Sequence, residues 1–279
     1  MLPTVAAAFR LVRPLNITII LAGVAAGVIL SNGSVVLPAE ILAAGGLAAA
    51  AAVLVAAGGN ALNDVVDLQI DAVHKADRPL PSGRISIRAA RLVWMLTTLA
   101  GVLLGAIVSG LHLGLAILAA VLLYVYSTKL KGRPFLGNAT VAFVVGLALL
   151  YGGLVAASPE HAVVGAVFAF LTTFSREVIK DVEDMEADAS AGLRTAPVVY
   201  GVAVARYVSV GGVLLTVLLT PIPFLWMDYG PLFLLLVLLA DLLLLRCVWI
   251  SPDRPEDAAA ASAWLKWGMV VGIAALIAA

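Results

Sequence analysis

The sequence has few charged side chains and a single cysteine, and both shortages limit what the protein can be. Charged residues make up 12% of its 279 residues, whereas 63% are hydrophobic. A soluble domain of this size needs far more polar surface to face water. Cys247 stands alone, which excludes a disulfide framework and a metal site built from cysteines. Together with a mean hydropathy of +1.10, this composition indicates a protein embedded in a membrane.

Long apolar runs account for most of the chain. A helix needs about 20 apolar residues to cross a bilayer, whereas strands of a membrane barrel show alternating runs of about ten residues. The runs in this sequence are of the longer kind. They predict nine membrane-spanning helices, at about residues 14–31, 38–62, 89–109, 112–127, 136–157, 162–182, 198–221, 229–250 and 260–279. We expect no cleaved signal peptide, because the first run lacks a convincing cleavage site and leads into further spans.

Basic residues are distributed asymmetrically. All 17 Lys and Arg residues can be placed on one side of a nine-span arrangement. The connections on the other side, near Asn32, His112, Pro159 and Asp228, contain no Lys or Arg. Cytoplasmic loops are enriched in these residues, so we expect a cell-membrane protein with its N-terminus and basic loops in the cytoplasm. An odd number of spans then places the C-terminus outside.

Two acidic segments recur at a spacing of 117 residues. Asp67 and Asp71 stand at the end of the second predicted span, and Asp184 and Asp188 stand at the end of the sixth. Four spans separate the two segments, so both helices run in the same direction. The pattern predicts an all-α membrane domain over residues 1–279, with two parallel four-helix repeats and a ninth helix. The loops at about 63–88 and 181–197 are the predicted catalytic loops.

Polar side chains share one face on each of these helices. At 100° per residue, the face spans about 80° of arc in the first repeat and about 60° in the second. The members are Asn63, Asp67 and Asp71 in the first stripe, and Glu177, Asp181, Asp184 and Asp188 in the second. Glu183 and Glu186 point elsewhere, and we expect them to be solvated. Aligned carboxylates at the end of an apolar helix need a counter-charge to stay ionised.

The two stripes predict a site for a metal-diphosphate. Hard oxygen ligands without His or Cys favour Mg²⁺ over zinc or copper, and Mg²⁺ is usually held by a few carboxylates together with substrate phosphates. A solvated helix end is a sufficient explanation for one Asp, but not for six residues in phase on two helices. The candidate metal ligands are Asn63, Asp67, Asp71, Asp181, Asp184 and Asp188. Four of them, Asp67, Asp71, Asp184 and Asp188, are the candidate catalytic residues.

Other polar residues near the stripes can bind substrate. Arg forms planar bidentate contacts with phosphate, although cytoplasmic loops are also basic for topological reasons alone. The face of Tyr126 can stabilise a carbocation, although interfacial Tyr is common in any membrane protein. Asn138 could contact a ligand or form a hydrogen bond between helices. The candidate substrate-binding residues are Asn63, Arg78, Tyr126, Ser127, Lys129, Lys131, Lys180 and Arg194.

These motifs resemble those of the UbiA superfamily of intramembrane prenyltransferases over nearly the whole chain. The first family signature, N-x-x-x-D-x-x-x-D followed by R-P-x-P-x-G, is matched by Asn63, Asp67, Asp71 and residues 78–83. The second, D-x-x-D-x-x-x-D, is matched by Asp181, Asp184 and Asp188. The resemblance implies that both stripes face a central cavity and hold Mg²⁺ bridging an isoprenyl diphosphate. It also implies an opening toward lipid for the prenyl chain.

Within this family, residues 176–184 and 195–201 look most like the archaeal digeranylgeranylglyceryl phosphate synthases. That likeness implies Mg²⁺-dependent transfer of a geranylgeranyl group from its diphosphate to geranylgeranylglyceryl phosphate, which forms an ether bond. The expected partners are the isoprenyl diphosphate, a lipid acceptor and membrane lipids, with no nucleic acid and no obligatory protein partner. We expect the cluster of Lys129, Lys131 and Arg133 to bind the acceptor phosphate.

Other functions remain open from the sequence. An aromatic acceptor such as 4-hydroxybenzoate, as in quinone synthesis, would use the same metal chemistry. An ion-coupled transporter also carries intramembrane carboxylates, but often with inverted repeats and helices broken near the midplane. Parallel repeats with carboxylates at cytoplasmic helix ends favour the enzyme. A purely structural membrane protein would not need the two stripes.

Overall fold

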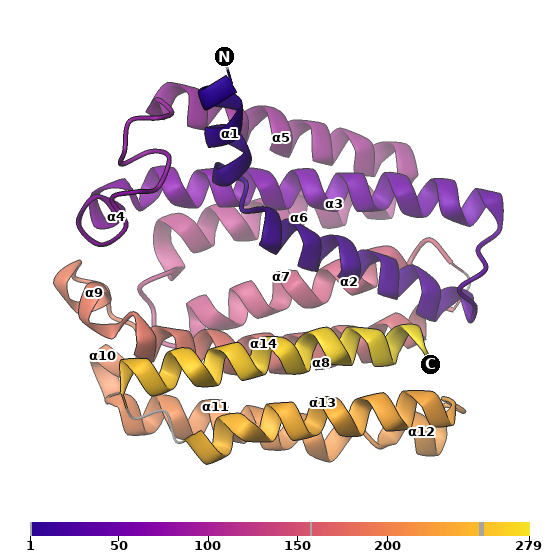
Figure 1. The fold of residues 1–279 in the computed structure, drawn as a ribbon. Coiled ribbons are helices and arrows are strands. Elements are labelled where there is room, and N and C mark those ends of the chain that lie inside the picture. The colour runs from indigo at the N-terminus through magenta and orange to yellow at the C-terminus, as the bar shows by residue number, and fades with distance from the viewer. Residues whose placement is uncertain (1, 157, 251–253) are drawn as a thin grey trace.

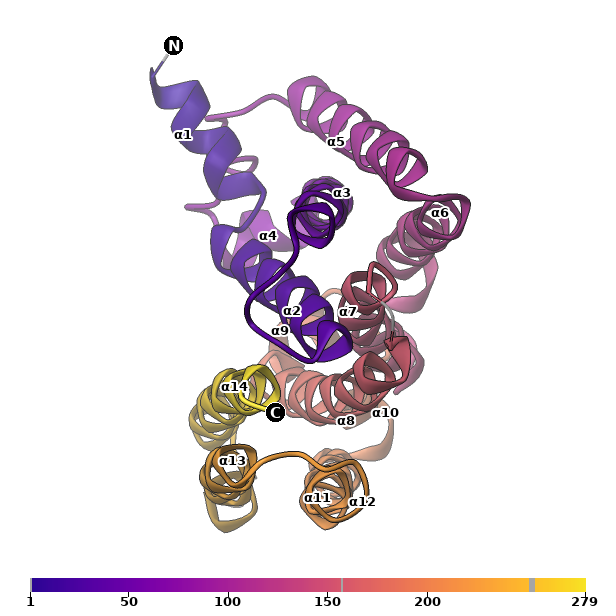
Figure 2. The same cartoon turned by 90° about the vertical axis from the view of Figure 1, so that its right-hand side faces the viewer.

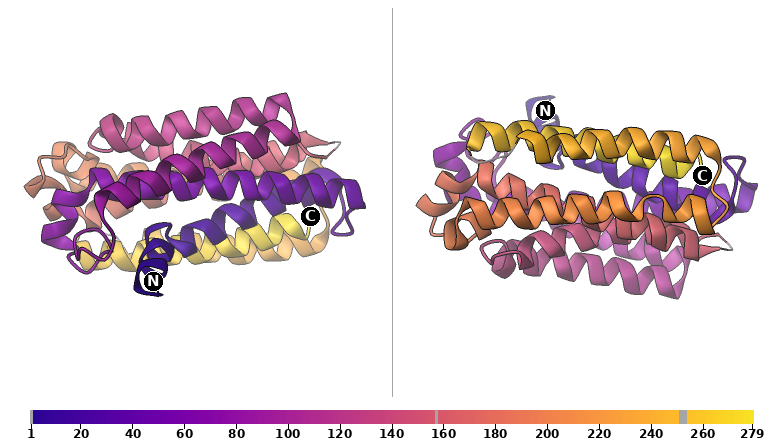
Figure 3. Two further views of the ribbon diagram at one scale, coloured as in Figure 1. Left: turned by 90° about the horizontal axis from the view of Figure 1, so that it is seen from above. Right: turned by 90° about the horizontal axis from the view of Figure 1, so that it is seen from below.

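The computed structural model describes residues 2–156, 158–250 and 254–279. Within these ranges the regular structure is entirely helical, with no strand, and nine helical segments are long and apolar enough to cross a membrane. The long helices run side by side along one axis (Figure 1; Figure 3). The predicted fold class is confirmed, and the chain is a multi-pass membrane protein.

The spans lie within a few residues of the predicted ones. They are α2 (Pro14–Asn32), α3 (Ala39–Val66), α5 (Ile87–Val108), α6 (Gly110–Val125) with the π-helical turn η1 (Tyr126–Leu130), α7 (Leu136–Gly153), α8 (Pro159–Glu183), α11 (Val202–Leu219) with α12 (Ile222–Trp226), α13 (Pro231–Ile250) and α14 (Pro255–Ile277). The last span begins at Pro255 rather than near residue 260. Proline in the first turn, followed by Glu256 and Asp257, suits a helix N-terminus and extends α14 beyond its apolar run.

Short helices gather at one end of the bundle. They are α1 (Leu2–Leu11), α4 (Leu68–His74), α9 (Met185–Ser190) and α10 (Ala196–Tyr200). Figure 1 shows α4, α9 and α10 at the same end, with the C-terminus at the opposite one. The segments that follow the two acidic helices therefore meet at one face of the bundle.

The two predicted repeats occupy two halves of the bundle. The first contains α2, α3, α5 and α6, the second contains α7, α8, α11 and α13, and α14 is the ninth span. Viewed along the helices, α2 and α7 lie between the outer helices of the two halves (Figure 2). The second helix of each repeat ends at an aspartate, with φ −81° and ψ 1° at Asp67 and φ −91° and ψ 4° at Asp184. These residues, 117 positions apart, therefore occupy equivalent places in the fold.

Glycines allow α2 and α7 to pack closely. A Cβ atom on Gly27 would overlap the backbone carbonyl of Leu149, and one on Gly152 would overlap that of Val24. Small residues at such crossings let the backbones of membrane helices approach each other. Because α2 and α7 belong to different repeats, this contact fixes how the two halves sit relative to each other.

We expect Gly27→Val to lower the melting temperature of the detergent-purified protein, because the branched side chain must push α2 away from α7. Overpacking of this kind costs about 1–3 kcal/mol. Gly46→Val in α3 is the matched control, since a Cβ atom there meets nothing within 4 Å in the described chain. Differential scanning fluorimetry compares the two variants. Equal melting temperatures would show that the crossing tolerates a side chain.

Candidate functional site

A cavity of about 440 Å³ lies between the two repeats, where α3 passes into α4 and α8 into α9. Both acidic stripes line it, together with residues of α2, η1, α7 and α14. Its deeper wall is apolar and includes Ile19, Leu123, Val141, Val144 and Val145. The cavity therefore joins a charged mouth to an apolar interior.

The first stripe keeps its helical phase across the break in α3. The backbone N–H of Asp67 donates to the carbonyl of Asn63 at 2.9 Å, and that of Asp71 donates to the carbonyl of Asp67 at 2.8 Å. The side-chain amide of Asn63 also donates to Oδ2 of Asp67 at 2.8 Å. Both carboxylates are buried and meet cations, Asp67 with Lys131, and Asp71 with Nη1 of Arg78 at 2.6 Å.

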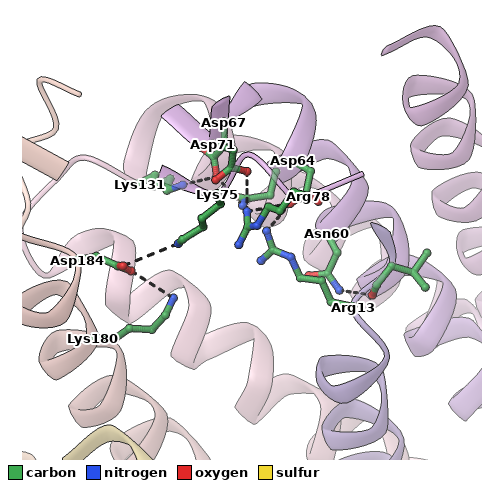
Figure 4. A network of polar contacts seen from close by, with 12 residues as sticks. Arg13, Asn60, Asp64, Asp67, Asp71, Lys75, Arg78, Lys131, Lys180 and Asp184 are labelled. Carbon is green, nitrogen blue, oxygen red and sulfur yellow. Dashed lines mark hydrogen bonds and ion pairs between the residues drawn. The ribbon is translucent and has the colours of Figure 1, made fainter. Parts of the chain in front are cut away.

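Asp64 is a third buried carboxylate of α3, and the stripe pattern did not single it out. It pairs with Arg13 and lies 3.5 Å from Nη1 of Arg78 (Figure 4). Arg13 sits between α1 and α2 with φ 56°, a left-handed conformation uncommon outside glycine. Because 51 residues separate Arg13 from Asp64, only the folded chain brings the two together.

Cations from both repeats approach the second stripe. Nζ of Lys75 lies 3.8 Å from Asp184, and Nζ of Lys180 lies 3.9 Å from it (Figure 4). Lys75 follows α4, so its contact spans the cavity from one repeat to the other. Burial and the neighbouring Asp184 carboxylate raise the pKa of Asp188, and the charges of Lys131 and Lys180 do not fully offset them. A bound cation would relieve this repulsion.

Deeper along α8, the side chains lie toward the apolar part of the cavity. Asn138 of α7 donates to Oδ2 of Asp181 at 2.9 Å, which is the predicted interhelical hydrogen bond, and it also lines the cavity. Nη1 of Arg176 donates to Oε1 of Glu177 at 2.8 Å, and both residues line the cavity. Arg176 is not among the substrate-binding residues predicted from the sequence. Glu183 and Glu186 are exposed, as predicted.

The π-helical turn divides the basic cluster after α6. In it, the N–H of Lys131 donates to the carbonyl of Tyr126 at 2.9 Å, and such turns are frequent at functional sites. Tyr126, Ser127 and Lys131 line the cavity, whereas Lys129 and Arg133 are exposed and outside its lining. Of the three basic residues predicted to bind the acceptor phosphate, Lys131 therefore faces the cavity and the other two do not, because neighbours in a helical turn point in different directions.

Arg194, another predicted substrate contact, is also exposed and outside the lining of the cavity. It follows α9 in the loop before α10, and its backbone N–H donates to the carbonyl of Gly132 at 3.2 Å. That hydrogen bond fixes the loop against the η1–α7 connection without directing the guanidinium inward. The other predicted residues that line the cavity are Asn63, Arg78, Tyr126, Ser127, Lys131 and Lys180.

The donor atoms of the stripes suit a hard cation. In the described part of the chain, no three His, Cys, Asp or Glu side chains converge as a ready-made metal site. However, carboxylates from both repeats line one cavity, and Oδ1 of Asn63 is buried without a hydrogen-bond partner among the described residues. Mg²⁺ needs few protein carboxylates when phosphates complete its shell. The residues therefore fit Mg²⁺ with a diphosphate better than Mg²⁺ alone.

Known proteins share both the sequence and the fold. The profile of the UbiA prenyltransferase family matches residues 17–270. The chain is 37% identical to the digeranylgeranylglyceryl phosphate synthase of Methanopyrus kandleri over 276 residues, which cover 96% of this chain and 97% of that protein. A solved structure described as that of a digeranylgeranylglyceryl phosphate synthase in membranes has a TM-score of 0.80 at 28% identity, covering 98% of this chain and 97% of that one. A UbiA homolog from Archaeoglobus fulgidus bound to GPP and Mg²⁺ has a TM-score of 0.69 at 21% identity, covering 97% and 99%, which is a likeness of fold.

Proposed function

The chain belongs to the UbiA prenyltransferase family, and we propose that it transfers a geranylgeranyl group from geranylgeranyl diphosphate to geranylgeranylglyceryl phosphate. The product is an ether lipid, and Mg²⁺ is the cofactor. The observation that carries this proposal is the end-to-end similarity to a digeranylgeranylglyceryl phosphate synthase at 37% identity. The metal-diphosphate chemistry of the cavity supports it independently.

In this proposal the two stripes hold Mg²⁺ against the donor diphosphate. The ligands are Asn63, Asp67, Asp71, Asp181, Asp184 and Asp188, all of which line the cavity. Bound Mg²⁺ would neutralise the diphosphate and make it a better leaving group. A homolog of the same fold that binds GPP and Mg²⁺ supports this arrangement.

The cations of the site serve the same diphosphate. Lys75, Arg78, Lys131 and Lys180 line the cavity, and each lies within 4 Å of a stripe carboxylate. A diphosphate entering between the stripes brings negative charge within reach of all four side chains. Their charge-assisted hydrogen bonds orient the donor and stabilise the negative charge that develops on the leaving oxygen.

The apolar interior then favours transfer over hydrolysis. As the C–O bond to the diphosphate breaks, positive charge develops on the allylic carbon of the donor. The ring of Tyr126 lies on the cavity wall and can stabilise that charge through its face. Leu123, Val141 and Val144 keep water from the carbon, so that the acceptor hydroxyl forms the new ether bond and the released diphosphate can accept its proton.

Two narrow apolar pockets, which we call extensions, share wall residues with the cavity. One lies among α2, α7, α8, α11, α13 and α14 and shares Ile19, Val145 and Met269 with the cavity. The other runs among α2, α3, α6 and α7 and shares Leu123 and Val144 with it. Donor and lipid acceptor each carry one long isoprenoid chain, whereas 4-hydroxybenzoate carries none. The second extension therefore favours the lipid acceptor over the aromatic one.

The proposed orientation in the cell membrane places the N-terminus and the cavity mouth in the cytoplasm and the C-terminus outside. The bias of Lys and Arg toward one side of the nine spans supports it. With the buried Cys247 replaced, we expect Ser82→Cys to react with an impermeant maleimide only from the cytoplasmic side, and Ser34→Cys only from outside. Both serines are exposed, which makes them a matched pair. Reversed labelling would invert the proposed topology.

Activity should require Mg²⁺ and both stripes. We expect excess EDTA to abolish prenyl transfer, and Asp67→Ala and Asp184→Ala each to lower kcat by about 100-fold or more, since each removes a ligand of a shared metal site. The double variant should lose little more than either single one. Glu186→Ala is the control, because Glu186 is acidic and near the site but exposed. Full turnover in EDTA, or in either single variant, would contradict the shared site.

Acceptor choice is tested by competition. Radiolabelled geranylgeranyl diphosphate is offered with geranylgeranylglyceryl phosphate and 4-hydroxybenzoate at equal concentration, and the products are separated by chromatography. We expect the ether lipid to predominate, because only this acceptor fills the second apolar extension. A predominantly aromatic product would assign the protein to quinone synthesis and leave its metal chemistry unchanged.

A further inference from the structure

Two buried polar atoms of residues that line the cavity lack a partner. They are Nε of Arg176 and Oγ1 of Thr173, both buried and without a hydrogen-bond partner among the described residues. Both residues belong to α8 and line the cavity, and residues three apart on a helix share a face. Leaving a buried donor unpaired costs stability, so a pair of them on one cavity wall points to a ligand that accepts both hydrogen bonds.

The first repeat contains no counterpart of this pair. At the spacing of 117 residues that relates Asp67 to Asp184, the equivalents of Thr173 and Arg176 are Ala56 and Gly59. Both line the same cavity, but a Cβ atom on Gly59 would already lie 2.7 Å from Cδ1 of Leu123. The acidic stripes are duplicated, and they share one metal-diphosphate in the proposed function. A polar pair present in only one repeat therefore serves a different group.

The position of Arg176 also separates it from the diphosphate. It precedes Asp184 by eight residues on α8, which places its backbone about 12 Å deeper along the helix axis. That distance exceeds the length of a diphosphate held at Asp184 and its counterpart Asp67. The ligand of Arg176 and Thr173 is thus a second polar group inside the same cavity.

The chemistry of the pair selects an anion. A guanidinium only donates hydrogen bonds and is always charged, and its planar fork matches the oxygens of a phosphate. Glu177 occupies Nη1 of Arg176, which leaves the Nε side of the fork for a ligand. The hydroxyl of Thr173 adds a donor one turn away. The Glu177 carboxylate would repel an anion on its own side and so restricts the ligand to that free edge.

We propose that Arg176 and Thr173 bind the phosphate of the lipid acceptor, an inference that rests on the proposed function. In this proposal the pair replaces Lys129 and Arg133, which are exposed, as the site that recognises the acceptor. A phosphate held there places the glycerol hydroxyl between the Arg176 side of α8 and the donor carbon near the stripes. The acceptor is thereby distinguished from any chain of the same length that lacks a phosphate.

The test compares two acceptors, geranylgeranylglyceryl phosphate and geranylgeranylglycerol, which lacks the phosphate. Steady-state kinetics are measured for the wild-type protein and for Arg176→Gln, Arg176→Lys and Thr173→Val in detergent. Thr140→Val is the matched control for Thr173, since Oγ1 of Thr140 donates to the carbonyl of Leu136 at 2.8 Å within its own helix and Thr140 lies outside the lining of the cavity. Arg91→Gln, at an exposed position of α5, is the control for loss of a positive charge. Gel filtration establishes that each variant is folded.

We expect Arg176→Gln to raise KM for the phosphorylated acceptor by about 10- to 100-fold, and Thr173→Val by about 3- to 10-fold, with KM for the donor unchanged. Arg176→Lys should fall between wild type and Arg176→Gln, because it keeps the charge but not the fork. The preference for the phosphorylated acceptor should collapse in Arg176→Gln and persist in both controls.

Two results would overturn the inference. One is an Arg176→Gln variant that keeps the wild-type preference for the phosphorylated acceptor. The other is an equal loss of activity with both acceptors, which would make Arg176 a structural residue. Failure of the wild-type protein to use geranylgeranylglyceryl phosphate at all would instead refute the proposed function, so the two failures are distinguishable.

Discussion

Charge compensation between segments that lie far apart in the chain underlies the rest of this structure. Buried carboxylates at the end of apolar helices are stable only if cations meet them, because desolvation penalises isolated charge. The cations come largely from other segments of the chain. Arg13 reaches Asp64 from before α2, Lys131 reaches Asp67 from beyond η1, and Lys75 spans the cavity to Asp184. The same pairs that stabilise the cavity also fill it with groups suited to a metal-diphosphate.

Duplication explains the two equivalent acidic stripes of the site. Differences between the two repeats explain the residues that occur on one side only. Asp67 and Asp184 end their helices in nearly the same backbone conformation, as two copies of one unit should. One diphosphate bound between two equivalent stripes requires no difference between the repeats. The second substrate does require such a difference, since it approaches from a single side. In the proposed acceptor site, Arg176 and Thr173 of the second repeat supply that asymmetry, because the first repeat has Gly59 and Ala56 at the equivalent positions.

The membrane contributes the apolar part of the mechanism. The apolar side chains that allow the helices to cross a bilayer also line the deeper part of the cavity and its two extensions. Residues such as Leu123 and Val144 line both the cavity and an extension, so the apolar pockets adjoin the cavity that carries the polar mouth. An enzyme that joins two isoprenoid chains can in this way keep both chains out of water while the reacting atoms stay near the charged mouth.

The sequence by itself determined the membrane class, the nine spans and the two stripes. Each of these follows from local periodicity or run length, and i, i+4 hydrogen bonds preserve the phase from Asn63 to Asp71 even where α3 ends. It did not determine which basic residues face the cavity, where Lys131 and Lys180 lie but the exposed Lys129 and Arg194 do not. Asp64, Arg13 and Arg176 were missed for the same reason. The direction of a loop side chain, and its partner 51 residues away, depend on how the helices pack, and only the tertiary structure decides that.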